Sequence, residues 1–334
     1  RERGGVWRGH NETKMKIAYI CDKNVFDSKM SRVRFHSMEA ISKVSDMRWL
    51  GRGWQGWNHN LKVDENIKRI SFSPDLIIGY KPLEIKGFFQ SRYKKCIRYN
   101  EMYDKVWTLK EIKESNADIV VCHHENDYKE YTTEPDLVKS LAGVDLVNVP
   151  HCAEKTIFKD YGLNKEIDLL LTGAIFADSA LGQHYPLRDR MAAKILPIMS
   201  QKFNCKIYQH PGYDLGDAST NRYAIDFARA ISSSKISITC SGLPRSRFGK
   251  YIEIPMCNTA IAADMPDEMH DFFSEFLINI DMKDSDDEII SKLEHYITNP
   301  EELSLKTKKG HELSSKFNQE HYAEVFLEKV GKLI

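Results

Sequence analysis

Residues 236–263, ISITCSGLPRSRFGKYIEIPMCNTAIAA, alternate between short apolar runs and a polar turn that contains glycine. The runs at 236–240 and 260–263 are typical of buried β-strands, and the segment at 249–256 between them is apolar and helix-like. A strand, a helix and a second strand in this order predict a βαβ unit with parallel strands. This stretch therefore favours an α/β fold.

The same alternation continues on both sides of this stretch. After residue 150 it predicts further strands and helices at 167–171, 185–203, 206–209, 223–232 and 276–280, and helices that begin near Asp286 and Pro300. Before residue 150 it predicts a helix after Arg32 and strands at 17–21, 47–50, 76–78, 96–99, 119–122 and 146–149. Two successive sets predict two doubly wound, mostly parallel sheets, with a ligand crevice between their carboxyl ends.

Size and composition narrow the class of protein. A chain of 334 residues exceeds the length at which one hydrophobic core keeps growing, so we expect two domains. The 48 basic and 48 acidic side chains balance, which argues against nucleic acid as a partner. The seven cysteines are scattered without a Cys-x-x-Cys pair, which predicts reduced core residues in a cytosolic protein.

The sequence predicts neither a membrane span nor a secretion signal. The apolar runs fall short of the roughly 18 residues that cross a membrane, and the N-terminus lacks the apolar region of a secretion signal. We therefore expect a cytoplasmic protein without a transmembrane segment. The polar residues 1–14 are expected to form a flexible tail or an expression remnant.

Three cations, Arg245, Arg247 and Lys250, follow the turn at Ser241 and Gly242. Backbone N–H groups in such a turn can hold phosphate oxygens, and Arg or Lys neutralises a diphosphate. In glycosyl transfer, negative charge grows on the departing phosphate, so fixed cations stabilise the transition state more than the ground state. The cluster therefore suits a nucleotide-diphosphate leaving group; a solvated basic loop is the alternative.

Glu253 is the acid within the apolar segment that follows these cations. A carboxylate in such surroundings needs a partner. It could accept hydrogen bonds from the hydroxyl groups of a ribose, or it could cap or pair with a neighbouring helix.

His123 and His124 follow a predicted strand of the N-terminal half, where an active-site loop of this architecture lies. Either could orient an acceptor hydroxyl or remove its proton, since both tasks need a group of suitable basicity within hydrogen-bond distance. A polar loop with helix-capping Asn126 and Asp127 is the alternative. A metal site is not expected, because no second cluster of His or Cys has ligand spacing.

Other polar and aromatic residues of the N-terminal half are candidates for binding an acceptor. They are Asp22, Arg34, Trp54, Trp57 and Asp104. The two tryptophans could stack on sugar faces or be ordinary packing residues. Glu101, which follows the strand at 96–99, is a further candidate catalytic residue; it could also lie on the surface.

Several of these segments resemble one family. Residues 248–263 resemble the Arg-x-Phe-Glu-x-x-Ala-Cys-Gly signature of group-1 glycosyltransferases, especially the subgroup similar to spore-maturation proteins. LTGA at 171–174, with YPLR at 185–188, resembles the strand, glycine loop and helix start that open the donor domain in that subgroup. Three further segments are similar to a following loop, to the interdomain linker and to an Asn-Glu-x-x-Asp loop: HPGY at 210–213, VPH at 149–151 and RYNEMYD at 98–104.

The resemblance implies a GT-B fold, in which two doubly wound Rossmann-like domains face a central cleft. It implies an acceptor domain at 15–150, a nucleotide-sugar donor domain at 151–318, and a C-terminal helix at 319–334 that packs back at the domain junction. The loop at 210–213 would frame the base of the donor. The donor-binding candidates are Gly173, His210, Pro211, Gly212, Tyr213, Ser241, Gly242, Arg245, Arg247, Lys250, Tyr251 and Glu253.

The implied activity is transfer of a hexose-type sugar from a UDP- or GDP-sugar to a hydroxyl of a glycan or glycoconjugate. Retention of configuration is implied, without a metal or other cofactor. Two departures leave the donor open: Arg245 stands at the first of two acids that many members carry, and Asn258 replaces a usual glycine. A nucleotide-sugar epimerase and a non-catalytic sugar or nucleotide-sugar binding protein are the alternatives.

Overall fold

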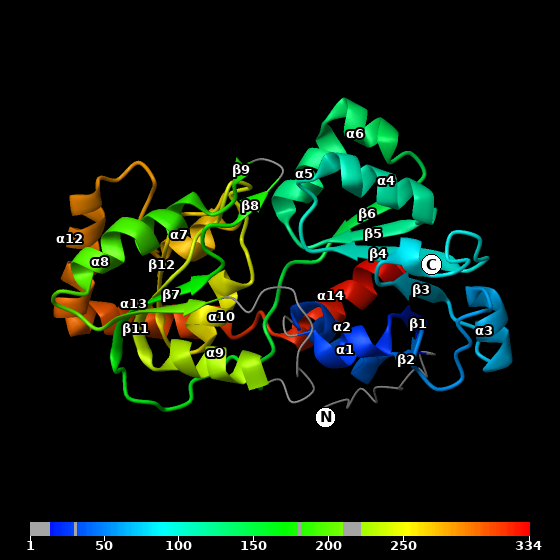
Figure 1. The fold of residues 1–334 in the computed structure, drawn as a ribbon, viewed down its shortest axis with the longest axis horizontal. Helices are drawn as coiled ribbons and strands as arrows, with labels where there is room; N and C mark the ends of the chain where they lie inside the picture. Colours follow the sequence, from blue (N-terminus) through cyan, green and yellow to red (C-terminus); the bar gives the residue numbers. More distant parts are fainter. Residues whose placement is uncertain (1–13, 30–31, 180–181, 210–221) are drawn as a thin grey trace, which may run out of the picture.

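The computed structural model describes residues 14–29, 32–179, 182–209 and 222–334. It consists of two lobes side by side, each with one parallel sheet between helices (Figure 1). Of the predicted tail at 1–14, only Lys14 belongs to the described part of the chain.

The first lobe is built on six strands: β1 (Lys16–Ile20), β2 (Asp46–Leu50), β3 (Leu76–Gly79), β4 (Lys94–Tyr99), β5 (Ile119–Cys122) and β6 (Asp145–Asn148). Their order is β2-β1-β3-β4-β5-β6, and each pairing is parallel. All residues of β3 and β5 are buried, as expected for a parallel sheet covered on both faces. The strand order reverses between β1 and β3, so ligands of this architecture bind outside the carboxyl ends of these strands.

The second lobe repeats the plan with five strands: β7 (Ile167–Gly173), β10 (Cys205–Gln209), β11 (Ser234–Ile238), β12 (Ala260–Ala263) and β13 (Ile278–Asn279). They follow the order β10-β7-β11-β12-β13, again in parallel. Here the order reverses between β7 and β11. The short antiparallel pair β8 (Asp178–Ser179) and β9 (Gly182–Gln183) follows β7.

Helices cover the faces of both sheets. In the first lobe they are α1 (Lys23–Ser28), α2 (Val33–Val44), α3 (Val63–Arg69), η1 (Pro82–Glu84), α4 (Lys105–Ser115), α5 (Glu125–Thr133) and α6 (Pro135–Ser140). In the second they are α7 (Pro186–Arg190), α8 (Leu196–Met199), α9 (Arg222–Ser232), α10 (Lys250–Met256), α11 (His270–Ser274), α12 (Asp286–Thr298) and α13 (Pro300–Ser314).

The helix predicted at 185–203 is interrupted. A π-helical turn, η2 (Met191–Ile195), lies between α7 and α8, and the Leu196 N–H reaches the carbonyl of Met191. Pro197 explains the interruption, because it lacks an N–H and its ring clashes with the carbonyl four residues earlier.

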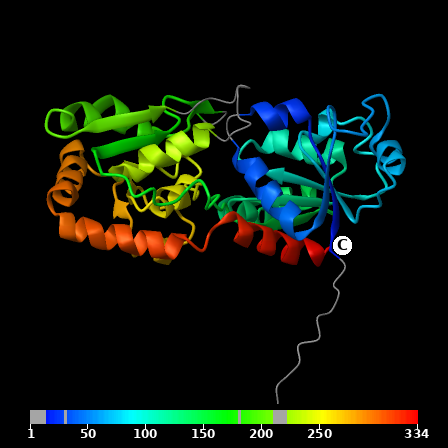
Figure 2. The same cartoon turned by 90° about the horizontal axis from the view of Figure 1, so that it is seen from below.

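The last helix, α14 (Gln319–Gly331), returns to the first lobe. It packs against α2 and lies beneath the first lobe, whereas α13 lies beneath the second (Figure 2). Tyr322, Phe326 and Val330 are buried in the same core as Ile17 and Phe35. The chain therefore crosses between the lobes a second time, and α14 belongs by its packing to the N-terminal core.

All seven cysteines are free thiols, and six of them are buried. Within the described residues, no helix is long and apolar enough to cross a membrane.

Candidate active site

Arg188 lies at the carboxyl edge of the second sheet, where β7 and β11 are neighbours. Gly173 ends β7 with a φ of +99°, and a Cβ atom there would lie 2.5 Å from Nη1 of Arg188, so glycine is required for the close approach. The Arg188 side chain is 3% exposed and donates to Oγ1 of Thr239 at 3.2 Å and to the Cys240 carbonyl at 3.4 Å. Its hydrogen-bond acceptors in the described chain are neutral. A buried cation without a counter-ion is suited to bind an anion.

Lys250 and Glu253 lie close to Arg188 on the first turn of α10. Nζ of Lys250 is 3.6 Å from Oε2 of Glu253 and 4.7 Å from the centre of the Phe227 ring. Burial lowers the pKa of Lys250, and the charge of Arg188 lowers it further, while Glu253 raises it. Glu253 is 8% exposed, and its Oε2 has no hydrogen-bond donor among the described residues. This edge therefore combines two cations with a buried carboxylate.

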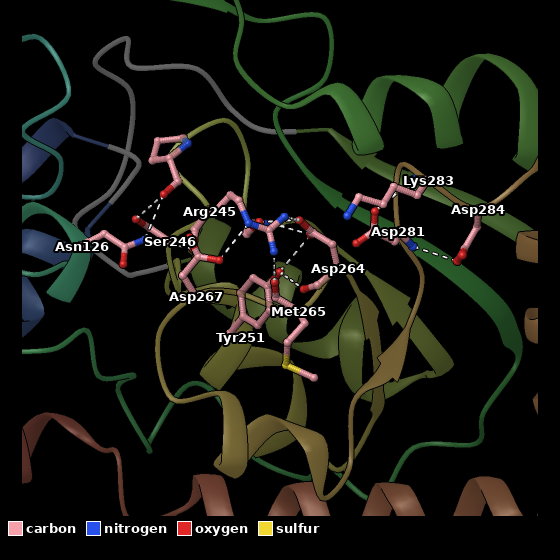
Figure 3. A network of polar contacts seen from close by, with 12 residues as sticks. Asn126, Arg245, Ser246, Tyr251, Asp264, Met265, Asp267, Asp281, Lys283 and Asp284 are labelled. Carbon is pink, nitrogen blue, oxygen red and sulfur yellow. Dashed lines mark hydrogen bonds and ion pairs between the residues drawn. The ribbon is translucent and has the colours of Figure 1, made fainter.

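The predicted donor residue Arg245 is engaged within its own lobe (Figure 3). Its Nε donates to Oδ1 of Asp267 at 2.8 Å and its Nη2 to the Met265 carbonyl at 2.8 Å, and Asp264 lies 3.8 Å away. Hydrogen bonding to Asp267 raises the pKa of Arg245. Arg245 is thus neutralised by acids, unlike Arg188.

The turn next to Arg245 is shaped by Ser241, Gly242 and Tyr251. The Ser241 N–H donates to Oδ1 of Asp264 at 2.8 Å, its hydroxyl donates to Oδ2, and the Tyr251 hydroxyl donates to the Asp264 carbonyl at 2.7 Å. A Cβ atom at Gly242, where φ is +65°, would lie 2.9 Å from the His184 carbonyl oxygen. Asp264 therefore anchors the turn that carries the predicted cations.

Arg247 lies in the junction between the lobes. Its Nη1 donates to the carbonyl of His151 at 3.0 Å, and its guanidinium lies 5.7 Å from the Phe317 ring centre. Burial lowers its pKa. The side chain therefore packs against the linker, and its Nη2 has no hydrogen-bond partner in the described chain.

The two predicted histidines have different surroundings. Nδ1 of His123 lies 3.1 Å from Oδ1 of Asn100 and its Nε2 lies 2.9 Å from the Tyr322 hydroxyl, so α14 holds this ring. His124 is 1% exposed, neither of its ring nitrogens has a hydrogen-bond partner in the described chain, and Oε1 of Glu268 is 3.9 Å from its Nδ1. Burial lowers the pKa of His124 to about 4 and that of His123 well below its usual range. Both rings are therefore neutral at pH 7.

Glu101 of the first lobe contacts His184 of the second lobe. Its Oε2 lies 3.5 Å from Nε2 of His184, whose buried ring packs against Tyr103 at 4.9 Å and Tyr185 at 4.4 Å. The guanidinium of Arg188 lies 4.0 Å from the centre of the Tyr185 ring. A continuous path of contacts thus joins the cationic edge of the second sheet to a carboxylate of the first lobe.

Asn126 and Glu268 connect the lobes directly. The Asn126 N–H donates to Oε1 of Glu268 at 3.1 Å, and its side-chain amide donates to the Pro244 carbonyl at 3.0 Å. Burial raises the pKa of Glu268. The alternative in which Asn126 and Asp127 cap a helix is wrong, because α5 begins at Glu125 and both residues lie in its first turn.

Two cavities open beside these residues. One, of about 620 Å³, lies at the carboxyl ends of β1, β3 and β4 and is lined by the predicted residues Arg34, Glu101 and Asp104. The other, of about 640 Å³, lies between the lobes and includes Asp104, Asn126 and Pro244. Asp104 also caps α4, since its carboxylate accepts the Trp107 N–H at 3.0 Å.

The remaining candidates lie elsewhere. Asp22 caps α1, Nε1 of Trp54 donates to the Cys21 carbonyl at 3.1 Å, and Trp57 packs against the core. These three do not line either of the cavities at the carboxyl ends of β1, β3 and β4 and between the lobes. The predicted loop of His210, Pro211, Gly212 and Tyr213 lies outside the described residues.

Sequence reasoning assigned no role to Arg188, His184 or Glu268. For Arg188 the available signal was a charged residue in the start of the helix that follows the glycine-terminated strand β7 and the short β8–β9 pair. No group of three or more His, Cys, Asp or Glu side chains that could hold a metal occurs in the described ranges.

Comparisons with known proteins agree with this architecture. No protein-family model and no curated protein matches the sequence. Among solved structures, a sucrose-phosphate synthase from Thermosynechococcus elongatus matches with a TM-score of 0.60 and 12% identity, covering 96% of this chain and 99% of that one. An alpha-glucosyltransferase in complex with UDP-glucose and DNA containing an abasic site matches with a TM-score of 0.60 and 10% identity, covering 96% and 99%.

HepE from Anabaena, in complex with UDP and glucose, matches with a TM-score of 0.55 and 8% identity, covering 95% of this chain and 100% of that one. These structural neighbours are GT-B glycosyltransferases. The likeness extends over nearly the whole chain and confirms the predicted fold class. The protein has an α/β GT-B fold, in which two Rossmann-like domains face a central cleft.

Proposed function

We propose that the protein is a glycosyltransferase that moves a hexose-type sugar from a UDP- or GDP-sugar to a hydroxyl of a glycan or glycoconjugate. The observation that carries the proposal is the buried guanidinium of Arg188 at the carboxyl edge of the second sheet, whose hydrogen-bond acceptors among the described residues are neutral. Lys250 and Glu253 lie at the same edge. HepE, a neighbour by fold, was solved with UDP and glucose, which is consistent with a nucleotide-sugar donor.

In this proposal, Arg188 and Lys250 bind the diphosphate of the donor, and Oε2 of Glu253 accepts hydrogen bonds from the ribose. Negative charge on the diphosphate increases as the glycosidic bond breaks, so fixed cations lower the barrier. The two cations supply positive charge that a metal ion supplies in other enzymes, so the reaction is proposed to be independent of a metal. Retention of configuration is proposed by the resemblance to group-1 enzymes.

The acceptor is assigned to the cavity of the first lobe. Glu101 lines this cavity and contacts His184 of the other lobe, so it is suited to bind the acceptor hydroxyl where the two substrates meet. His124 is neutral, its ring nitrogens have no hydrogen-bond partner among the described residues, and it is proposed to orient a hydroxyl by hydrogen bonding. A pKa of about 4 makes it a weak base at pH 7.

Replacing Glu253 by alanine is expected to weaken donor binding about 10- to 100-fold, because charged hydrogen bonds to the ribose are lost. Titration calorimetry with UDP and GDP measures this change. Glu301→Ala, on the exposed side of α13, should leave binding unchanged. A larger loss of acceptor affinity than of donor affinity would contradict the ribose assignment.

Turnover itself distinguishes the activity from its alternatives. The purified protein is incubated with UDP- and GDP-hexoses, with and without a glycan acceptor, and the products are separated. Transfer that requires an acceptor supports the proposal. Release of a rearranged sugar nucleotide without acceptor would identify an epimerase, and nucleotide-sugar binding without turnover would identify a binding protein.

A further inference from the structure

The cavity of the first lobe is lined by two arginines that have no carboxylate partner among the described residues. Arg34 comes from α2 and Arg98 from β4, and both line the cavity at the carboxyl ends of β1, β3 and β4. An arginine side chain remains charged at all accessible pH values, and its planar fork matches carboxylate and phosphate groups. Two such cations in one cavity therefore influence which kind of ligand the cavity binds.

Arg98 is fixed by neutral groups. Its Nη2 donates to Oγ of Ser37 at 2.5 Å, and its Nε and Nη2 donate to the Tyr322 hydroxyl at 3.2 and 3.0 Å. Its Nη1 donates to the carbonyl of Arg34 at 3.2 Å. Arg98 therefore contributes a positive charge that the side chains around it hold in place but do not neutralise.

Arg34 is available to a ligand. Its guanidinium makes no hydrogen bond and no ion pair to another described residue; the described contact is with the Tyr80 ring, whose centre is 5.7 Å away. Within the part of the chain that the structure describes, the N–H donors of the Arg34 guanidinium thus remain unused. Burial lowers the pKa of the nearby His123, and the charges of Arg98 and Arg34 lower it further.

The acids of the cavity are engaged elsewhere. Glu84 pairs with Lys81 at 3.2 Å, Glu111 accepts from the Tyr99 hydroxyl at 2.5 Å, Asp104 caps α4, and Glu101 contacts His184. None of them forms an ion pair with Arg34 or Arg98 in the part of the chain that the structure describes. Arg34 therefore has no carboxylate partner among the described residues and can pair with an anionic group of a ligand; Asp104 and Glu111, whose described partners are a backbone N–H and a hydroxyl, also have no cation partner there.

We propose that the acceptor carries an anionic group, a phosphate or a carboxylate, which Arg34 binds as a fork while Arg98 adds fixed positive charge. The proposal rests on the assignment of this cavity to the acceptor in the proposed function. A cavity of about 620 Å³ lies within the usual range for small-ligand sites. With its anionic group at Arg34, a sugar unit presents a hydroxyl group toward Glu101, which lines the same cavity.

The test compares three probes of similar size: glucose 6-phosphate, glucuronic acid and neutral glucose. Binding to the wild-type protein is measured by titration calorimetry, in the presence of UDP or GDP where either binds. At least one anionic probe is expected to bind at least about tenfold more tightly than glucose, since a charged hydrogen bond is worth about 1.5–3 kcal/mol. Preference for the phosphate or for the carboxylate identifies the source of the anion.

Arg34→Ala should abolish this preference, and Arg34→Lys should restore only part of it, because lysine keeps the charge but loses the fork. Arg52→Ala, an exposed arginine of the same lobe, is the matched control and should bind like the wild type. Equal affinity for glucose and the anions, or an unchanged preference in Arg34→Ala, would overturn the inference.

The same samples separate this inference from the proposed function. If a nucleoside diphosphate binds but the anionic probes show no preference, the donor assignment stands and the anionic acceptor is wrong. If the anions bind through Arg34 but no nucleoside diphosphate binds, an anion site is present and the glycosyltransferase proposal fails.

Discussion

Replacing Arg188 by alanine is expected to reduce kcat with a nucleotide sugar about 100- to 1,000-fold, the range for loss of one preorganised group that stabilises transition-state charge. The guanidinium is buried at the carboxyl edge of the second sheet, and its described acceptors are neutral. In the proposed reaction it faces a diphosphate whose charge grows as the sugar departs. Steady-state kinetics with saturating donor measure the effect.

Two variants separate this role from packing. Arg188→Lys keeps the charge but loses the planar fork, so partial recovery of kcat is expected. Arg190→Ala is the matched control, because Arg190 lies two residues further on the same helix and pairs with Asp286 at 2.7 Å; it should alter stability more than kcat. Unchanged kcat and unchanged donor KM in Arg188→Ala would contradict a role in leaving-group binding.

Acidification from pH 7 to pH 5 is expected to destabilise the wild-type protein by about 2 kcal/mol relative to His124→Gln. In the folded state burial lowers the pKa of His124 from 6.5 to about 4. Between these two values the unfolded chain takes up a proton that the folded chain excludes, so stability falls as the pH falls. Above pH 6.5 the ring is neutral in both states, and the difference disappears.

The comparison with a variant is necessary because other titratable groups have the opposite effect on stability when the pH falls. Burial raises the pKa of Asp127 to about 7 and also raises that of Glu268, so the folded state binds protons at these sites and gains stability on acidification. Urea unfolding of both proteins at pH 7 and pH 5 gives the difference. His321→Gln, on an exposed position of α14, is the control substitution. Parallel pH profiles for the wild type and His124→Gln would contradict a buried, neutral His124.

The strands could be predicted closely from the sequence. Runs such as 119–122 and 260–263 coincide with β5 and β12, because a parallel sheet covered on both faces requires continuous apolar residues. Helices α4 and α5 were not predicted. Of the nine residues of α5 only Asp127 and Tyr131 are buried, so the apolar periodicity that marks a helix is weak there.

The candidate site could be predicted from the sequence only where its residues lie in one continuous segment. Lys250 and Glu253 lie on one turn of one helix, and their residue types indicate phosphate and ribose chemistry. Arg188 depends on the absence of a side chain at Gly173, and the contact of Glu101 with His184 forms only when the two lobes meet. Such contacts between distant segments leave no local pattern.

The central claim is that the second lobe binds a nucleoside diphosphate through Arg188 and Lys250. The most direct measurement is calorimetric titration of the wild type and the Arg188→Ala/Lys250→Ala double variant with UDP, GDP and the corresponding monophosphates. We expect one diphosphate to bind at least about tenfold more tightly than its monophosphate, because the charged contacts to the second phosphate are worth at least about 1.5 kcal/mol, and we expect this advantage to be lost in the double variant. Absence of diphosphate binding, or equal binding of diphosphate and monophosphate by the wild type, would contradict the account.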